Sequence, residues 1–103
     1  MLFILKLCFD QQLMERAHIF ISGIVQGVYY RYNAMKKAQE LGLKGWVRNL
    51  RDGRVEVVCE GRREDIDRLI EWCKKGPPGA YVESVQVAFE QFKGEFRTFE
   101  ILY

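Results

Sequence analysis

Apolar and polar residues alternate along several stretches of the chain in the two-residue period that is typical of β-strands with one buried face. In "RAHIFISG", Ala17, Ile19 and Ile21 point one way, and the residues between them point the other way. The stretches "LKGWVRNL" and "RVEVVCEG" predict two more strands, joined at Asp52-Gly53, a pair that favours a hairpin turn. "YVESVQVAFE" predicts a fourth strand, and "FRTFEILY" predicts a short final one.

Two other stretches have apolar residues every three or four positions, which is the spacing of one helix face. The first is "YRYNAMKKAQEL", followed by Gly42, which suits a left-handed helix cap. The second ends at "KKGPPG", where lysines, glycine and proline favour a helix end. The apolar positions expected to face the core are Tyr30, Ala34, Ala38 and Leu41 in the first helix, and Ile66, Leu69, Ile70 and Cys73 in the second.

The elements follow the order β-α-β-β-α-β, with one additional short strand at the end. Because crossover connections are right-handed, this order predicts a ferredoxin-like α+β sandwich. We expect an antiparallel sheet in the order 4-1-3-2, plus the short C-terminal strand, with both helices on one face. A chain of 103 residues is long enough for one domain with a modest core. We assign this domain to residues 16–103.

Residues 1–15 differ in pattern from the rest of the chain. "MLFILKLCF" is apolar but shorter than the ~20 residues that span a bilayer. It also lacks the charged start and the small-residue cleavage site of a signal peptide. "MERAHIFIS" resembles a natural start at Met14, so we predict that residues 1–15 are a dispensable N-terminal extension. A short extra strand or a packing arm is the alternative.

Composition and charge indicate an ordinary globular protein. The formal net charge is +2, and no run of five or six like charges suggests a nucleic-acid-binding tail. Cys8, Cys59 and Cys73 are widely spaced and odd in number, which argues against both a zinc site and a disulfide framework. We therefore expect buried, reduced thiols in a cytoplasmic monomer with neither a nucleic-acid nor a membrane partner.

Candidate chemistry lies in "GIVQGVYYR", residues 23–31, between the first strand and the first helix. Gly23 and Gly27 allow the backbone to curl so that successive N–H groups converge into an anion-binding nest. Arg31 opens the helix, where the dipole disfavours a cation unless an anion is bound there too. Its planar guanidinium can bind phosphate through two hydrogen bonds. Taken alone, the glycine spacing slightly favours a simpler interpretation, a turn beside a solvated arginine.

Two blocks of sequence resemble the acylphosphatase family. The first is "GIVQGVYYR". The second is "A-x2-LGLKGWVRNLRDGRVEVVCEG", which begins at Ala38, and the likeness covers roughly residues 16–103. Tyr30 departs from the phenylalanine that is common in the family, and a hydroxyl should be tolerated at a helix start. The resemblance implies hydrolysis of the carboxyl-phosphate bond of small acyl phosphates, which yields a carboxylate and inorganic phosphate.

The resemblance also implies roles for particular residues. Arg31 matches the arginine that binds the phosphoryl group, and Asn49, from "GWVRN", matches the asparagine that positions the attacking water. The backbone N–H groups expected to bind phosphate belong to Val25, Gln26, Gly27, Val28, Tyr29, Tyr30 and Arg31. No cofactor and no metal are expected, and inorganic phosphate should act as a competitive inhibitor. These roles agree with the chemistry, because phosphoryl transfer mainly needs positioning and stabilisation of charge.

Two other functions remain open at this stage. An RNA recognition motif has the same order of elements, but the strand "RVEVVCEG" lacks the aromatic residues that such a motif stacks on bases. An accessory domain of a larger carbamoyl-phosphate-processing protein is the second alternative to a free-standing enzyme. His18 is expected at the surface, Cys59 in the core, and Tyr29, Tyr30 and Tyr32 as walls of the site. Trp46 and Arg48 should share a face opposite Val47 and Asn49, with a cation–π contact.

Overall fold

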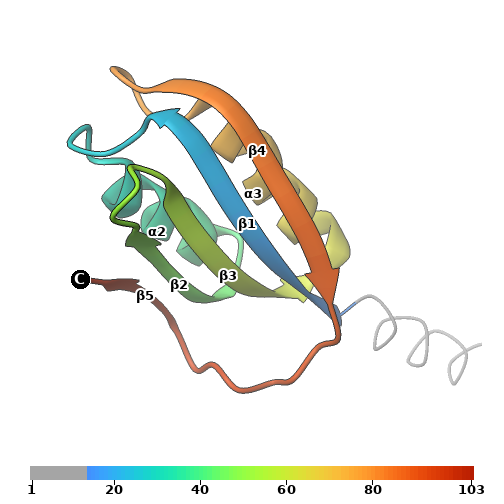
Figure 1. The fold of residues 1–103 in the computed structure, drawn as a ribbon. Helices are drawn as coiled ribbons and strands as arrows, with labels where there is room; N and C mark the ends of the chain where they lie inside the picture. The colour runs from blue at the N-terminus through green and yellow to red at the C-terminus, as the bar shows by residue number, and fades with distance from the viewer. Residues whose placement is uncertain (1–13) are drawn as a thin grey trace, which may run out of the picture.

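One sheet and two helices make up the computed structural model, which describes residues 14–103. Both helices pack on one face of the sheet and leave the other face open (Figure 1). The elements in chain order are β1 (Met14–Ile24), α2 (Tyr30–Glu40), β2 (Lys44–Asn49), β3 (Val55–Arg62), α3 (Arg63–Lys75), β4 (Tyr81–Glu90) and β5 (Phe99–Leu102). The predicted extension lies outside the described residues except for Met14 and Glu15, which form the start of β1.

The sheet confirms the predicted order of four strands and the predicted short C-terminal strand, which lies beside β2 and gives the order β4-β1-β3-β2-β5. Neighbours among the first four strands are antiparallel, but β5 pairs with β2 in parallel. The sheet is therefore mixed, and the expectation of an antiparallel sheet holds only for its first four strands. The parallel pairing follows from strand direction. β4 runs opposite to β2, and the 91–98 connection crosses the end of the sheet where β4 finishes, so β5 starts from that end and runs in the same direction as β2 (Figure 1).

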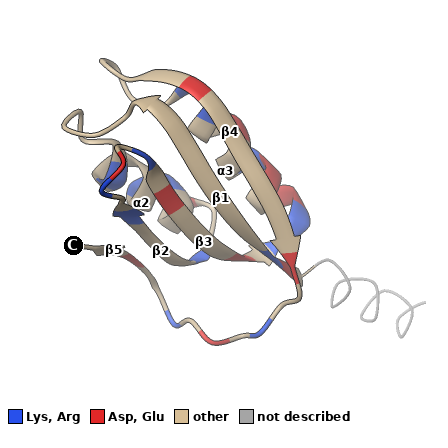
Figure 2. Ribbon diagram, in the orientation of Figure 1, with Lys and Arg blue, Asp and Glu red and all other residues tan. Residues whose placement is uncertain are grey.

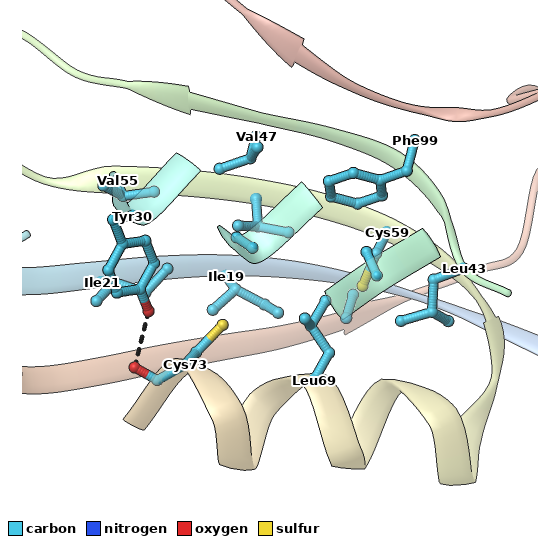
Figure 3. Packing of buried hydrophobic residues seen from close by; sticks show 14 of the residues in the cluster. Ile19, Ile21, Tyr30, Leu43, Val47, Val55, Cys59, Leu69, Cys73 and Phe99 are labelled. Carbon is cyan, nitrogen blue, oxygen red and sulfur yellow. Dashed lines mark hydrogen bonds between the residues drawn. The ribbon is translucent and has the colours of Figure 1, made fainter. Parts of the chain in front are cut away.

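The core lies between the helices and the sheet, as Figure 3 shows. Ala17, Ile19 and Ile21 of β1 are fully buried, in line with the alternation seen in the sequence. The helix residues that meet them are Tyr30, Ala34, Ala38, Ile66, Leu69 and Cys73. Most of the predicted helix faces are therefore confirmed.

The two described cysteines belong to this core. Cys59 and Cys73 are buried and free, and burial raises the pKa of each thiol to about 12. At neutral pH both thiols are thus protonated and inert, since the thiolate is the reactive form. Cys59 is in the core as expected.

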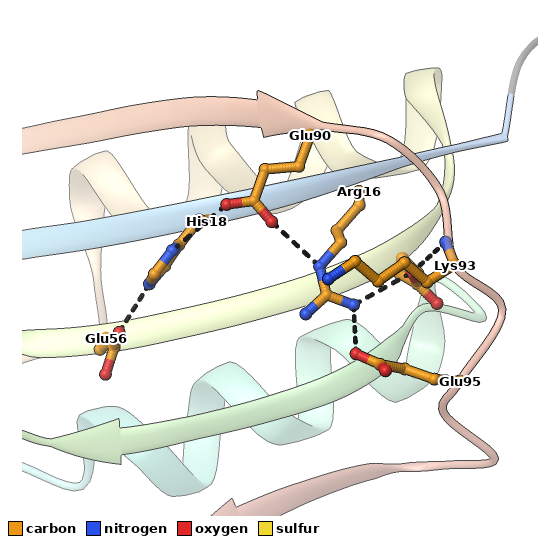
Figure 4. Close-up of polar contacts among 7 residues, drawn as sticks. Arg16, His18, Glu56, Glu90, Lys93 and Glu95 are labelled. Carbon is orange, nitrogen blue, oxygen red and sulfur yellow. Dashed lines mark hydrogen bonds and ion pairs between the residues drawn. The ribbon is translucent and has the colours of Figure 1, made fainter.

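The open face of the sheet carries a network of charged side chains centred on Arg16 (Figure 4). The guanidinium of Arg16 donates hydrogen bonds to Glu60 at 3.2 Å, Glu90 at 3.1 Å and Glu95 at 2.6 Å. Glu60 also accepts a hydrogen bond from the backbone N–H of Lys93 at 2.8 Å. Because Lys93 and Glu95 belong to the 91–98 connection, the network anchors this connection to β1 and β3 and thereby helps to place β5.

His18 lies on the same open face but is more enclosed than the sequence suggested. Its Nε2 atom is 2.6 Å from a carboxylate oxygen of Glu56, and its Nδ1 atom is 3.6 Å from Glu90. The Nε atom of Arg48 donates to the other oxygen of Glu56 at 2.6 Å, and the Arg48 guanidinium stacks 5.0 Å over the ring of Trp46. The expected cation–π pair is therefore confirmed, and His18 is a structural partner of β3 and β4.

Candidate active site

The loop after β1 enters α2 through two left-handed residues. Gly27 has a φ of +76°, and Tyr29, which is not a glycine, has a φ of 60°. A non-glycine residue in this region is uncommon, and such residues gather at functional sites. The carbonyl of Tyr29 accepts hydrogen bonds from the backbone N–H of Asn33 at 3.1 Å and from its side chain at 2.9 Å. These bonds start α2 directly after Tyr29.

Arg31 stands in the first turn of α2, which contains no acidic residue. Within residues 14–103, no carboxylate forms an ion pair with Arg31. Its guanidinium instead lies 5.0 Å from the centre of the Tyr103 ring. An unpaired cation beside the positive end of a helix creates a strong local attraction for an anion.

A pocket of about 380 Å³ opens between this loop, the end of β2 and the segment that includes β5. It brings Arg31 and Asn49 together although they are far apart in the sequence. The residues that line it are Val25, Gly27, Tyr29, Tyr30, Arg31, Tyr32, Asn49, Ile101 and Tyr103. Most of the residues predicted for the site therefore share one pocket.

Asn49 is the last residue of β2, on the face of the strand that carries buried Val47. Its side-chain oxygen is buried, and no group among residues 14–103 donates a hydrogen bond to it. Buried polar atoms in native proteins nearly always have a partner, so an unsatisfied one calls for an explanation. Asn49 is also one of the residues that line the pocket that holds Arg31.

Gln26 and Val28 belong to the predicted loop but do not line the pocket. The side-chain amide of Gln26 donates to the backbone carbonyls of Leu50 at 2.7 Å and Arg54 at 2.9 Å. These two bonds tie the loop to the hairpin that follows Asn49. Val28 packs against the core. Both side chains therefore hold the loop in place and do not face the pocket space.

The three neighbouring tyrosines have different surroundings. Tyr30 is buried, and its hydroxyl donates to the backbone carbonyl of Cys73 at 2.8 Å (Figure 3). Pro77, four residues after Cys73, has no N–H with which to satisfy that carbonyl, so the Tyr30 hydroxyl supplies the missing donor. Burial raises the pKa of the Tyr30 phenol well above its usual range, which rules it out as an acid or base. Tyr29 and Tyr32 remain exposed at the rim.

Sequence reasoning did not predict that Ile101 and Tyr103 belong to the pocket. They reach it because β5 pairs in parallel with β2, with Ile101 opposite Val47. The sequence carried no signal for this contact, since the 91–98 connection is irregular and the pairing partner of the last strand was undetermined.

The described residues were also compared with the features of metal sites, membrane spans and nucleic-acid-binding surfaces. Across residues 14–103, no group of three or more His, Cys, Asp or Glu side chains could hold a metal ion. None of the helices in the same residues has the length and apolarity needed to cross a membrane. In Figure 2, acidic and basic residues are interspersed along the helices and strands.

Comparison with known proteins assigns the family. A family model described as Acylphosphatase matches residues 17–101. An acylphosphatase from Acaryochloris marina is 63% identical over 82 residues, which are 80% of this chain and 87% of that relative. One from Methylococcus capsulatus is 53% identical over 89 residues, or 86% of this chain and 97% of the relative. The solved structure of an acylphosphatase from Coxiella burnetii is similar with a TM-score of 0.85 at 39% identity, covering 90% of this chain and 97% of that one.

These similarities exclude the RNA recognition motif, which shared only the order of elements. They also favour an enzyme over an accessory domain, because this chain spans nearly the full length of relatives that are themselves named acylphosphatases. The chain belongs to the acylphosphatase family, and it is an enzyme of that type.

Proposed function

We propose that this enzyme hydrolyses small acyl phosphates by direct attack of water on the phosphoryl group, with Arg31 and Asn49 in separate roles. Arg31 and the backbone N–H groups of residues 25–31 hold the phosphoryl group, and Asn49 holds the water. The observation that carries the proposal is a pairing of two residues that line one pocket. Among residues 14–103, the Arg31 guanidinium has no carboxylate partner and the buried amide oxygen of Asn49 has no donor. A phosphoryl group would satisfy the first, and a water molecule would satisfy the second.

The chemistry of the bond suits this arrangement. The water oxygen forms a bond to phosphorus while the bond between phosphorus and the acyl oxygen breaks, and the carboxylate leaves with the electron pair. A carboxylate is a good leaving group, so no general acid is required. Negative charge on the phosphoryl oxygens is stabilised by fixed donors, which is the main contribution that proteins make to phosphoryl transfer. We assign the water's proton to a phosphate oxygen, since the described residues that line the pocket include neither a histidine nor an acidic side chain.

The proposal extends to the conditions under which the enzyme works. It needs no metal ion or cofactor, because Arg31 and the positive end of α2 supply the charge that a metal would otherwise provide. Inorganic phosphate, as product, competes with substrate for the same donors. We further propose a monomer that works in the cytoplasm, where its buried thiols stay reduced. Activity should therefore survive exhaustive chelation, and strict dependence on added magnesium or zinc would contradict this model of the site.

The two roles can be separated by measuring turnover and phosphate inhibition in the same variants. Arg31→Ala should abolish turnover and weaken phosphate inhibition together, because the pocket loses its formal positive charge. Asn49→Ala should reduce kcat by ~10²-fold or more, on the scale of losing a positioned catalytic group. Its inhibition constant for phosphate should stay close to that of the wild type, since the ligands of the anion remain.

Two further variants complete the design. Arg51→Ala removes an exposed arginine outside the pocket and is the matched control, for which both quantities should be unchanged. Asn49→Asp is nearly isosteric but places a carboxylate near the phosphoryl group, so it should be as inactive as Asn49→Ala and bind phosphate less well. Wild-type turnover in folded Asn49→Ala, or undiminished phosphate inhibition in Arg31→Ala, would overturn the assignment.

A further inference from the structure

The turn between β2 and β3 comes directly after Asn49, and one side chain joins it to the loop of residues 25–31. The amide nitrogen of Gln26 donates to the backbone carbonyls of Leu50 at 2.7 Å and Arg54 at 2.9 Å. The loop and the turn lie at the same end of the sheet (Figure 1). Among residues 14–103, no other hydrogen bond joins the loop to residues 50–54. The contact between the two segments therefore depends on a single amide group.

The two acceptors are the carbonyls that close the turn. The Arg54 carbonyl also accepts a hydrogen bond from the backbone N–H of Leu50 at 2.8 Å, and the Leu50 carbonyl accepts one from the backbone N–H of Gly53 at 3.2 Å. A carbonyl oxygen has two lone pairs, so each can accept both of its bonds. The Gln26 amide thus completes the set of hydrogen bonds around Leu50, the residue that follows Asn49.

Few contacts within the described chain orient the side chain of Asn49. Its oxygen has no donor among residues 14–103. Its partner across the sheet is Val55, in the last pair of the β2–β3 ladder, and the pairing of β2 with β5 ends one residue earlier, at Arg48. The direction of a side chain on a strand follows from the backbone that carries it. The backbone at Leu50, which the Gln26 amide holds, therefore helps to determine where the Asn49 amide lies.

The loop itself has anchors besides Gln26. Val25 is buried, and Val28 packs against the core. The Tyr29 carbonyl accepts two hydrogen bonds from Asn33, which fix the start of α2. Loss of the Gln26 amide should therefore release the turn more than it disturbs the loop.

Resting on the proposed function of Asn49, we propose that Gln26 is a positioning residue for the attack of water. Its amide holds the turn against the loop and thereby sets the place of Asn49 relative to the phosphoryl group. Gln26 does not line the pocket, so it acts through Asn49 and not on the substrate. A misplacement of about 1 Å can cost ~10²-fold in rate, so a side chain outside the pocket can influence kcat.

The test measures kcat for acetyl phosphate and the inhibition constant for inorganic phosphate in Gln26→Met, which keeps the length of the side chain and removes both donors. The value of kcat per folded molecule should fall by ~10-fold, and the inhibition constant should stay within about 3-fold of wild type. Gln26→Glu is nearly isosteric and has no donor at neutral pH, so it should lose at least as much. Gln39→Met is the matched control, because it removes a glutamine amide that donates to the carbonyl of Phe99 at 3.3 Å, outside the pocket. Both quantities should be unchanged in this control.

The combination with Asn49→Ala separates positioning from a general effect on the fold. If Gln26 acts through Asn49, adding Gln26→Met to Asn49→Ala should change kcat by no more than about 2-fold. An effect on stability alone would leave kcat per folded molecule unchanged in both backgrounds.

Each other outcome counts against the positioning role. Wild-type kcat in Gln26→Met, or a ~10-fold loss that is repeated in the Asn49→Ala background, would overturn it. An equal loss of phosphate inhibition would also overturn it, since Gln26 would then act on the loop. Failure of both Gln26 variants to fold would show that the amide serves the whole fold, which likewise contradicts a role confined to positioning.

Asn49→Ala, measured alone, keeps the two proposals apart. If its kcat is that of the wild type, the proposed function fails. If its kcat is reduced while that of Gln26→Met is not, only the positioning role of Gln26 fails.

Discussion

Arg16 and Arg31 lie near the two ends of the stretch formed by β1 and its following loop, and their surroundings are opposite. Arg16 is buried among the carboxylates of Glu60, Glu90 and Glu95. Arg31 has no carboxylate partner among the described residues and lies beside the ring of Tyr103. Burial alone would lower the pKa of the Arg16 guanidinium, but its hydrogen bonds to the carboxylates outweigh this and raise it. The fold thus neutralises the cation that joins its strands and leaves unpaired the cation that faces the pocket.

Two buried hydrogen-bond acceptors, Glu60 near Arg16 and Asn49 in the pocket with Arg31, also differ in whether they have donors. Glu60 accepts hydrogen bonds from Arg16 and from the backbone of Lys93. The side-chain oxygen of Asn49 is also buried but has no donor within the described chain. A buried polar group with hydrogen-bond partners contributes to stability, whereas one without a partner reduces it and calls for an explanation. The fold therefore satisfies Glu60 from within the chain and leaves the Asn49 oxygen without a donor among residues 14–103.

The largest expected effect on stability comes from removing Arg16, whose guanidinium is paired with carboxylates. Arg16→Ala leaves the buried carboxylate of Glu60 without its cation, and removing one partner of a buried ion pair typically reduces the free energy of unfolding by ~3–5 kcal/mol. We expect a loss near the lower value, about 3 kcal/mol, because Glu90 and Glu95 are partly exposed to solvent. Thermal or chemical unfolding monitored by circular dichroism measures this loss.

The matched control is Arg68→Ala, which breaks an exposed ion pair with Asp65 and should change stability by less than ~0.5 kcal/mol. Turnover of acetyl phosphate per folded molecule should stay within about 3-fold of wild type in Arg16→Ala, since the damage is to stability. If both variants were equally stable, the contrast between the two arginines would lose its energetic basis.

Substitution of Arg31, the arginine without a carboxylate partner among the described residues, should leave stability intact and reduce activity. Arg31→Lys keeps the positive charge but loses the planar pair of donors, so kcat should fall by ~10²-fold to 10³-fold, on the scale of losing one stabilising donor in a transition state. The free energy of unfolding should stay within ~0.5 kcal/mol of wild type because Arg31 forms no ion pair with any of residues 14–103. A lysine variant that retained full activity would show that charge alone, without the geometry of the guanidinium, is sufficient.

A smaller loss of stability should follow when the pH is lowered and Glu56, on the open face of the sheet, is protonated. Burial alone would raise the pKa of Glu56, but hydrogen bonds from His18 and Arg48 outweigh it, so the pKa is lowered from its ordinary value of 4.5. The folded state therefore favours the ionised carboxylate. The resulting stabilisation is fully present above about pH 4.5 and is lost as the pH falls through the lower pKa of the folded state.

Glu56→Gln should accordingly reduce the free energy of unfolding by about 1.5–3 kcal/mol at pH 7, the scale of a hydrogen bond to a charged group. The difference from wild type should shrink as the pH falls below 4.5, as denaturant titrations at a series of pH values would show. Glu83→Gln, at an exposed position of β4, should give no such pH-dependent difference. A constant difference at every pH would mean that the charge of Glu56 is not what the network uses.

The smallest expected effect concerns the chain before β1. Met14 is two residues from Arg16, so a preceding segment that packed there would add to the stability of the region around Arg16. We predict that a chain starting at Met14 keeps its activity and that its thermal midpoint falls by less than about 4–8 °C, the shift equivalent to ~1 kcal/mol in a domain of this size. A larger fall in differential scanning calorimetry would show that residues 1–13 act as a packing arm.

Much of the fold could be predicted because local pattern and burial agree. Ala17, Ile19 and Ile21 alternate in the sequence and are buried in the structure, and Gly42 has the positive φ expected of a helix cap. The parallel pairing of β5 could not be predicted, since it depends on where the 91–98 connection is anchored. That anchor is Arg16, whose partners lie up to 79 residues away in the chain.

The candidate site was predictable to a similar degree. The loop and Asn49 could be named from motifs, but motifs do not distinguish residues that face the pocket from those that support it. Gln26 and Val28 turned out to support the loop, and Tyr30 is tied to the core by its hydroxyl. His18 belongs to an ion-pair network that an alternating strand pattern cannot reveal, because a polar residue on the open face looks solvated whatever its cross-strand neighbours are.

The two hydrogen bonds of the Gln26 amide have a consequence for the internal motion of the molecule. They join the loop to both ends of the β2–β3 turn, at Leu50 and Arg54. The loop therefore cannot open locally without also releasing the turn, and the two segments should form one cooperative unit in amide hydrogen exchange. Arg31 follows the loop and Asn49 precedes the turn, so a neutral side chain links the two segments that carry them.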